Sequence, residues 1–176
     1  MTGGRVIMLT GAMAAGKSTV ATLLAERLPR SVHLRGDVFR RMVVNGRVDM
    51  GPDASPGALA QLRLRYDLAT YTADRYAAAG FTVVLQDVVI GPELTGFVDR
   101  IATPDRYLVV LAPSVAALER REQERDKIGY TGFSPADLDR LLRDDTPRLG
   151  YWLDSSDLSP TATVDTILAN LDAAAV

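Results

Sequence analysis

The chain has 176 residues, a length typical of one domain, and its 47% hydrophobic and 24% charged residues are those of an ordinary globular protein. A formal net charge of −2 argues against a broad basic face for duplex nucleic acid, and the lack of cysteine excludes disulfides, thiolate zinc sites and a cysteine nucleophile. No stretch approaches the roughly 20 apolar residues of a membrane span, and the first apolar run is too short for a signal peptide, so a cytoplasmic protein is expected.

The first predicted strand, residues 5–10, runs into a glycine-rich motif of the form G-x-x-x-x-G-K-S. A predicted helix over residues 17–28 follows, and Pro29 ends it. In this setting backbone N–H groups and a helix N-terminus surround phosphates, the lysine reaches the β- and γ-phosphates, and the serine hydroxyl ligates Mg²⁺. The sequence therefore predicts a nucleotide-binding P-loop formed by Gly11, Ala12, Met13, Ala14, Ala15, Gly16, Lys17, Ser18 and Thr19.

The lysine of this motif stands out against the composition. Only Lys17 and Lys127 are lysines among the 20 basic residues, so a chain that otherwise uses arginine keeps a lysine where a phosphate needs one. The interior of the loop lacks an additional glycine, but helix-compatible alanines leave the backbone donors available. Phosphate binding is therefore expected.

A short strand over residues 31–34 is followed by a turn at Arg35-Gly36 and a predicted helix over residues 37–44. Asp37 at its start can accept the proton of an attacking hydroxyl or bind substrate, because ligands of parallel sheets bind where strands end. Its alternative role is that of a helix N-cap, and the two roles are compatible. Arg40 is a candidate for binding an anionic part of the acceptor, or is a solvent-facing arginine.

Residues 45–56 contain Gly, Pro, Asn and Asp and predict an exposed loop. The long helix expected over residues 57–79 ends at Gly80 and carries two apolar stripes. The segment from Asn45 to Tyr71 is expected to select the substrate, within a substrate region of about residues 37–71. The stripes consist of Leu62, Tyr66, Ala69 and Ala73, and of Leu64, Leu68 and Tyr71.

A β-branched strand over residues 81–86 ends at Asp87. A carboxylate at this position can meet Mg²⁺, often through water, or contact the substrate. The alternative is a solvated turn aspartate, but a buried strand that ends in a single acid needs a reason.

A short helix over residues 92–102 and a strand over residues 106–111 come next, and Ser114 is a plausible N-cap for a helix over residues 114–124. The charged run after this strand predicts a lid over about residues 120–135. On closure, Arg121 and Arg125 would neutralise the transferring phosphoryl group, and Arg120 of the same cluster would contact the nucleotide. The alternative is a solvated helix with no direct role.

Ser134-Pro135 opens a further helix, residues 151–153 form a last strand, and Ser159-Pro160 caps a final helix with apolar residues at i, i+3, i+4 and i+7. Strands that alternate with helices predict a parallel sheet covered on both faces. The expected architecture is a single three-layer α/β domain over residues 1–176.

With its P-loop, Asp37, Asp87 and the arginine-rich segment, the chain resembles the small P-loop kinases over essentially its full length. The nearest pattern is that of the AAA_33-type phosphotransferases, a group that includes chloramphenicol phosphotransferase and gluconate kinase. This resemblance implies a five-stranded parallel sheet of order 2-3-1-4-5 with a helical lid, ATP and Mg²⁺ as cofactors, and Asp37 as the base. It also implies that the stretch over residues 152–165 lies near the adenine.

The function that follows is transfer of the γ-phosphoryl group of ATP to a hydroxyl of a small metabolite or antibiotic, by a monomer or homodimer with no membrane partner. No substrate motif of chloramphenicol phosphotransferase stands out in residues 45–66, so the acceptor stays open. Residues 37–40 also resemble the D-x-x-R of polynucleotide 5′-kinases and zeta-toxin-type kinases, although the net acidity disfavours a nucleic-acid acceptor. The third alternative is a nucleotide-binding regulator without an acceptor.

Overall fold

The sheet at the centre of the molecule has five parallel strands in the order β2-β3-β1-β4-β5. The computed structural model describes residues 3–51, 54–124 and 132–176. Both the predicted fold class and the predicted strand order are confirmed. The strands are β1 (Arg5–Gly11), β2 (Ser31–Arg35), β3 (Thr82–Gln86), β4 (Arg106–Leu111) and β5 (Tyr151–Leu153).

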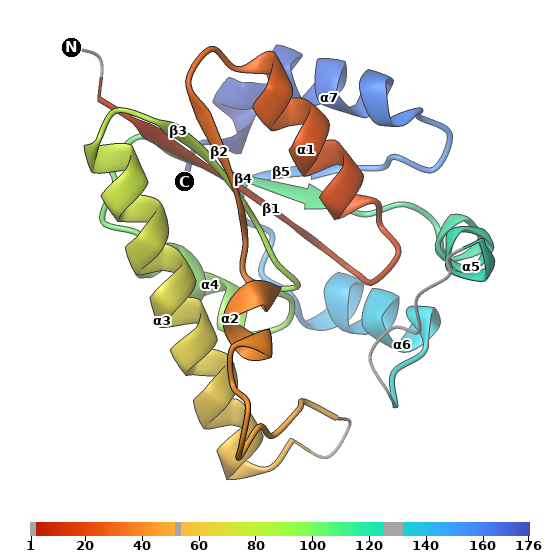
Figure 1. Cartoon of the computed structure of the whole chain (residues 1–176). Coiled ribbons are helices and arrows are strands. Elements are labelled where there is room, and N and C mark those ends of the chain that lie inside the picture. The colour runs from red at the N-terminus through yellow and green to blue at the C-terminus, as the bar shows by residue number, and fades with distance from the viewer. Residues whose placement is uncertain (1–2, 52–53, 125–131) are drawn as a thin grey trace.

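Helices cover both faces of this sheet (Figure 1). α1 (Lys17–Arg27) and α7 (Pro160–Ala169) pack together over one face, and α3 (Pro56–Ala78) and α4 (Glu93–Asp99) lie over the other. Shorter elements stand near the carboxyl ends of the strands. They are α2 (Asp37–Arg41), α5 (Val115–Gln123), α6 (Pro135–Arg140) and a π-helix (Leu141–Asp145); a 3-10 helix (Leu171–Ala174) lies close to the C-terminus.

The strands form because their apolar runs are continuous rather than alternating. Residues 6–9 of β1 and residues 108–111 of β4 are each at most 1% exposed. Strands buried on both faces need apolar side chains at every position, and each such side chain contributes roughly 1.5–3 kcal/mol on burial. The core therefore lies directly under the loops that follow these strands.

The register of the sheet brings the strand ends together. Gly11 pairs with Leu111 of β4, while Gln86 pairs with Leu9 on one side and with Arg35 on the other. The backbone N–H of Asp87 extends this pairing by donating to the carbonyl of Leu9 at 3.2 Å. The loops after β1, β2 and β3 therefore start from one edge.

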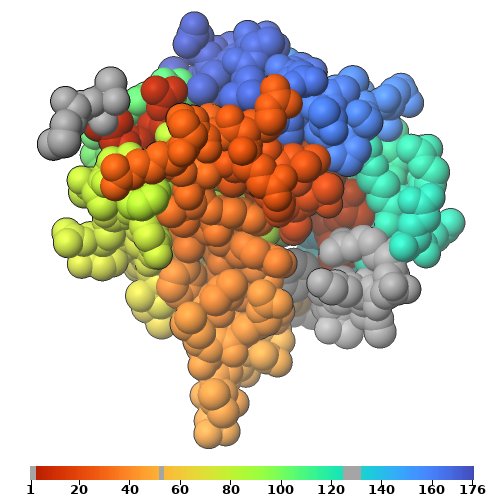
Figure 2. All heavy atoms as spheres, turned by 45° about the horizontal axis from the view of Figure 1, so that its top comes forward, coloured from red at the N-terminus to blue at the C-terminus, as the bar shows by residue number. Residues whose placement is uncertain are grey.

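Two predicted helices are shorter in the structure. The helix after β2 ends at Arg41 rather than at residue 44, because β-branched Val43 and Val44 favour extended backbone and Gly46, with a φ of 76°, turns the chain. Figure 2 shows the segment that follows α2 (orange) projecting from the body of the molecule. The helix predicted over residues 92–102 spans only Glu93–Asp99.

Only one of the two apolar stripes of α3 is buried. Tyr66, Ala69 and Ala73 are at most 2% exposed, whereas Leu64 and Tyr71 of the other stripe are 53% and 66% exposed. The helix packs on the sheet along one side, so a second stripe can have no place in the core.

Among the described residues, none of the helices has the length and apolarity that a membrane span requires.

Candidate functional site

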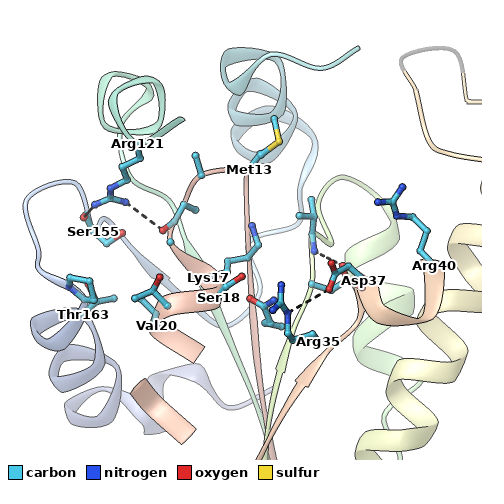
Figure 3. A pocket seen from close by; sticks show the side chains of 18 of the residues that line it. Met13, Lys17, Ser18, Val20, Arg35, Asp37, Arg40, Arg121, Ser155 and Thr163 are labelled. Carbon is cyan, nitrogen blue, oxygen red and sulfur yellow. Dashed lines mark hydrogen bonds and ion pairs between the residues drawn. The ribbon is translucent and has the colours of Figure 1, made fainter. Parts of the chain in front are cut away.

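A cleft of about 990 Å³ opens at the carboxyl edge of the sheet, as the parallel topology predicts. Figure 3 shows Lys17 and Ser18 on one side of this cleft and Asp37 on the other, with Arg35 between them. The structure brings most of the predicted site residues to this cleft. They are Met13, Ala14, Ala15, Gly16, Lys17, Ser18, Thr19, Asp37, Arg40, Asp87 and Arg121.

The P-loop is held by its own backbone geometry. Gly16 has a φ of 90° and precedes α1, and Ala14 also takes the left-handed conformation, with a φ of 62°. Left-handed backbone costs a residue with a Cβ roughly 1–2 kcal/mol, so the interior of the loop is strained rather than helix-compatible. Lys17 is 9% exposed. Its ammonium group donates to the carbonyl oxygens of Gly11 at 2.9 Å and Ala12 at 2.7 Å.

Asp37 is the first residue of α2, and Gly36 occupies the N-cap position. The N-cap alternative for Asp37 is therefore wrong, because a side chain inside the first turn does not cap that helix. Its carboxylate pairs with Arg41 at 3.2 Å and lies 3.7 Å from the Nε of Arg35. With 29% of the side chain exposed, Asp37 remains accessible from the cleft.

Asp87 is not a solvated turn aspartate. Its side chain is 2% exposed, and its Oδ1 accepts the Val88 N–H at 2.7 Å and pairs with the Nη2 of Arg65 at 3.1 Å. Burial raises the pKa of Asp87, and the Arg65 guanidinium opposes this by lowering it. Among the described residues, its Oδ2 accepts no hydrogen bond. That oxygen is buried beside Gly36.

The residues present fit Mg²⁺. Ser18 stands in the first turn of α1 and Asp87 offers its unpartnered Oδ2, and both line the cleft. The described part of the chain has no group of three or more His, Cys, Asp or Glu side chains that could hold a metal ion by themselves. Mg²⁺ in phosphoryl-transfer sites takes few protein ligands and keeps water and phosphate oxygens, which suits such a sparse set.

Sequence reasoning missed the role of Arg65. This arginine is 6% exposed and is the charged partner of Asp87. A signal was available in the spacing, because Arg65 stands three residues after Leu62 and four before Ala69, on the buried stripe of α3. A charge on the buried face of a helix requires a partner, and the acid at the end of β3 supplies it.

The predicted arginine cluster divides into three cases. Arg121 of α5 reaches back to the P-loop, where its guanidinium donates to the carbonyls of Ala15 at 3.4 Å and Ser155 at 2.7 Å (Figure 3). Arg120 is exposed and is not among the residues that line the cleft, so its contact with the nucleotide stays a prediction. Arg125 and the centre of the predicted lid lie outside the described residues.

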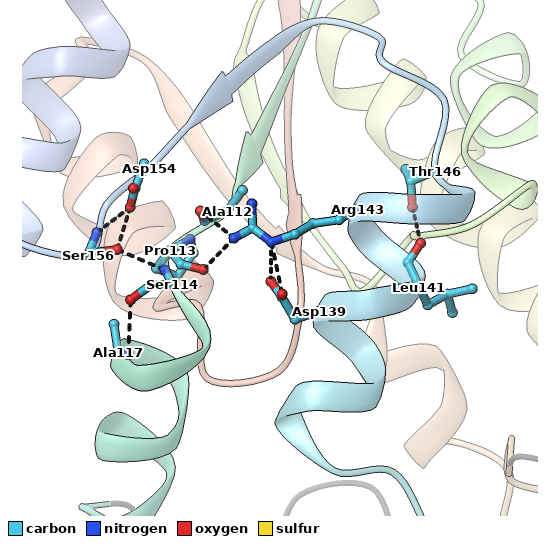
Figure 4. A network of polar contacts seen from close by, with 10 residues as sticks. All are labelled: Ala112, Pro113, Ser114, Ala117, Asp139, Leu141, Arg143, Thr146, Asp154 and Ser156. Carbon is cyan, nitrogen blue, oxygen red and sulfur yellow. Dashed lines mark hydrogen bonds and ion pairs between the residues drawn. The ribbon is translucent and has the colours of Figure 1, made fainter.

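The segment before α7 and the start of α7 form one wall of the cleft, and the loop after β4 is hydrogen-bonded to that segment. Arg143 of the π-helix pairs with Asp139 at 2.8 Å and donates to the carbonyl of Pro113 at 3.0 Å, which fixes α6 against the end of β4 (Figure 4). The Ser156 hydroxyl accepts the Ser114 N–H at 2.8 Å in the same network. The family resemblance implies that residues 152–165 lie near the adenine. Four residues of this stretch line the cleft, namely Ser155, Leu158, Pro160 and Thr163.

Comparison with solved structures identifies the fold. The APS kinase CysC of Mycobacterium tuberculosis, solved with AMPPNP and APS, superposes with a TM-score of 0.70 at 19% identity over 97% of this chain and 98% of that one. A tunicamycin resistance protein of Deinococcus radiodurans gives 0.65 at 18% identity over 95% of each chain. A gluconokinase of Sinorhizobium meliloti gives 0.62 at 18% identity over 96% and 91%. A comparison with curated protein sequences finds no match.

The family model that matches the chain is AAA_33, described as an AAA domain, over residues 6–144. This span holds the P-loop, Asp37, Asp87 and Arg121, and it covers well over half of the sequence. The chain therefore belongs to the AAA_33 family of P-loop domains.

Proposed function

We propose that the protein is an Mg-ATP-dependent phosphotransferase that moves the γ-phosphoryl group of ATP to a hydroxyl of a small molecule. One observation carries the proposal: Lys17 and Ser18 of the P-loop and the acids Asp37 and Asp87 line the same cleft. A phosphate-binding loop facing a carboxylate is the arrangement that phosphoryl transfer to an alcohol needs.

Each side chain has a role in this reaction. The acceptor oxygen attacks the γ-phosphorus as the bond to the β–γ bridging oxygen breaks, the bonding electrons leave with ADP, and the acceptor proton passes to the Asp37 carboxylate. Lys17 stabilises charge on the β- and γ-phosphates, and Arg121 adds positive charge beside the P-loop. Ser18 and Asp87 would hold Mg²⁺, which neutralises phosphate charge when bound.

Two observations support this assignment. The chain shares its fold over nearly its whole length with an APS kinase and a gluconokinase, and the names of both proteins describe kinases of small molecules. Arg35 and Arg41 also flank the Asp37 carboxylate, at 3.7 Å and 3.2 Å, so positive charge surrounds the proposed base.

The experiment uses ATP labelled in its γ-phosphate with two acceptor panels, small hydroxylated metabolites and antibiotics in one and 5′-hydroxyl oligonucleotides in the other. Label is expected in the small molecules. The Asp37→Asn variant should keep nucleotide affinity and lose roughly 10²–10⁴-fold in turnover. The matched control is Asp165→Asn, which breaks an exposed pair with Arg27 far from the cleft. Unchanged turnover in Asp37→Asn would remove Asp37 from the mechanism.

The alternatives correspond to other outcomes of the same experiment. Label in oligonucleotides alone would favour a polynucleotide 5′-kinase that uses Asp37 and Arg40. Arg40 pairs with Asp49 at 2.5 Å, and that pair would have to open for Arg40 to bind an acceptor phosphate. Nucleotide binding without transfer to either panel would favour a regulator.

A further inference from the structure

A second, smaller cavity of about 140 Å³ adjoins the cleft. Arg40, Met50 and Val88 line both spaces, and among the described residues none from the P-loop lines the smaller one. The apolar cavity, as it is named from here on, therefore lies at the acceptor end of the site rather than at the nucleotide end.

Segments far apart in the sequence build its wall, and their side chains are mostly aliphatic or aromatic. The volume is close to the roughly 150 Å³ of apolar cavities that accept one benzene ring, but this space is open to solvent on one side, where Val48 and Leu64 are 41% and 53% exposed. A space of this size suits an aryl ring or a branched alkyl group. The apolar residues of the wall are Val43, Val48, Met50, Ala58, Leu62, Leu64, Tyr66, Val88, Ile90, Phe133, Leu138 and Leu141.

The neutral polar groups at the wall are engaged within the protein. The side-chain amide of Gln61 donates to the Gly46 carbonyl at 2.7 Å and accepts the Val48 N–H at 2.9 Å. The Tyr66 hydroxyl donates to the Val88 carbonyl at 3.1 Å. A hydroxyl-rich ligand that entered this space would lose water without equivalent partners, which is costly.

The charged groups at the wall are likewise paired. Arg40 binds Asp49 at 2.5 Å and Arg65 binds the buried Asp87 at 3.1 Å. Each guanidinium has a carboxylate beside it, so these two arginines do not need an anionic ligand to balance their charge. The occupant that gains most from this environment is apolar.

Hydrogen bonds hold part of the wall of the apolar cavity in place. The Thr146 hydroxyl accepts the Gly91 N–H at 2.6 Å and donates to the Leu141 carbonyl at 3.0 Å (Figure 4). This bridge joins the chain after β3, next to Ile90, to the π-helix that begins at Leu141. Both of these apolar residues line the cavity.

The distance from the apolar cavity to the proposed base is short. Arg40 stands one helical turn, about 5 Å along the axis, after Asp37, and Val88 directly follows Asp87. A small molecule can therefore place a hydroxyl at Asp37 and an apolar group in the cavity at the same time.

We infer that the acceptor is a small alcohol with an aryl or branched alkyl group, which the apolar cavity holds while the hydroxyl lies at Asp37. The inference rests on the proposed phosphotransferase function and names its substrate class. It separates this chain from a kinase whose acceptor is polar over its whole surface, such as a polyol or a sugar acid.

The first test measures binding and needs no turnover. The probe is 2-phenylethanol, observed by ligand-detected NMR with the full-length protein. Leu62→Trp fills the cavity and Val48→Trp narrows it from an exposed position, and each should weaken binding at least about 10-fold. Leu68→Trp, on the exposed side of α3 and outside the cavity, should leave binding unchanged. Absence of binding to the wild type, or the same loss in all three variants, would overturn the inference.

The second test measures transfer from labelled ATP to 2-phenylethanol and to glycerol. A kcat/KM at least about 10-fold higher for the aryl alcohol is expected, and Leu62→Trp should abolish that preference by raising KM. Preference for glycerol would overturn the inference and leave the proposed function intact. Nucleotide binding with no transfer to any alcohol would overturn the proposed function, while the binding test still decides what the cavity holds.

Discussion

The P-loop and the apolar cavity lie in adjoining spaces but are built in opposite ways. The P-loop is one run of consecutive residues between β1 and α1, and it presents backbone groups together with Lys17. The apolar cavity is assembled from α2, α3, α6, the π-helix and the segments after α2, after β3 and before α6, and it presents side chains. Backbone geometry recognises the part of a substrate that is always the same, whereas side chains from several segments recognise the part that varies.

The largest expected effect is at Arg65, which lies where the two regions meet. Arg65→Met leaves the buried Asp87 unpaired and should lower the free energy of unfolding by about 3–5 kcal/mol, as measured by urea denaturation. The neighbouring Arg63→Met breaks an exposed pair with Glu93 and should cost at most about 1 kcal/mol. Equal losses in the two variants would contradict a structural role for the buried pair.

The same variant has a pH signature. Without Arg65 only the Val88 hydrogen bond and the Lys17 charge oppose the rise that burial imposes on the pKa of Asp87, so its folded-state pKa lies further above its unfolded value. A group with a raised folded pKa contributes stability that is full below the unfolded pKa and is lost as the pH rises through the folded one. The unfolding free energy of Arg65→Met should therefore fall as the pH rises through that window.

The next effect separates the P-loop from the apolar cavity. Lys17→Met should reduce turnover by roughly 10²–10³-fold, because a preorganised positive charge at the phosphates is removed. Binding of 2-phenylethanol should not change, since Lys17 does not line the apolar cavity. Arg27→Met at the other end of α1 is the control, because it changes a basic residue whose exposed pair lies far from the cleft. Weaker probe binding in Lys17→Met would contradict the division into two regions.

A smaller effect is expected at Gly36, where β2 meets α2. A Cβ here would lie 2.1 Å from the Oδ2 of Asp87, a carboxylate that is buried and pinned by Arg65. Gly36→Ala should cost about 1–3 kcal/mol of stability through overpacking and should reduce turnover by displacing Asp87. Gly57→Ala is the control, because its Cβ would meet only the Ser55 hydroxyl at 3.9 Å. Thermal unfolding and turnover measured together test this prediction.

The smallest effect relieves strain in the P-loop. Ala14 has a φ of 62°, a conformation that glycine adopts without penalty. Ala14→Gly should change stability by no more than about 1 kcal/mol in the favourable direction, because relief of strain is partly offset by the greater freedom of the unfolded chain. A loss larger than 1 kcal/mol would show that the Ala14 methyl group, which packs in the core, matters more than the strain.

Local sequence signals predicted the helices and strands well where caps and continuous apolar runs mark them. The strands over residues 106–111 and 151–153 are found as predicted. The ends of α2 and α4 were misjudged, since these helices stop at Arg41 and Asp99. Local preferences at these positions compete with helix propagation, and a periodic pattern does not show which one prevails.

The P-loop could be predicted from the amino-acid sequence alone, because it is a contiguous motif whose phosphate-binding groups lie largely in its backbone. The sequence also placed Asp37 and Asp87 at strand ends, where a parallel sheet gathers its ligands. The burial of Asp87 against Arg65, and the cavity that distant apolar side chains line beside Asp37, became evident only in the folded chain. The spacing of α3 places a charge on its buried face, but which segment supplies the partner, and which side chains meet at the cavity, depends on contacts between segments far apart in the chain.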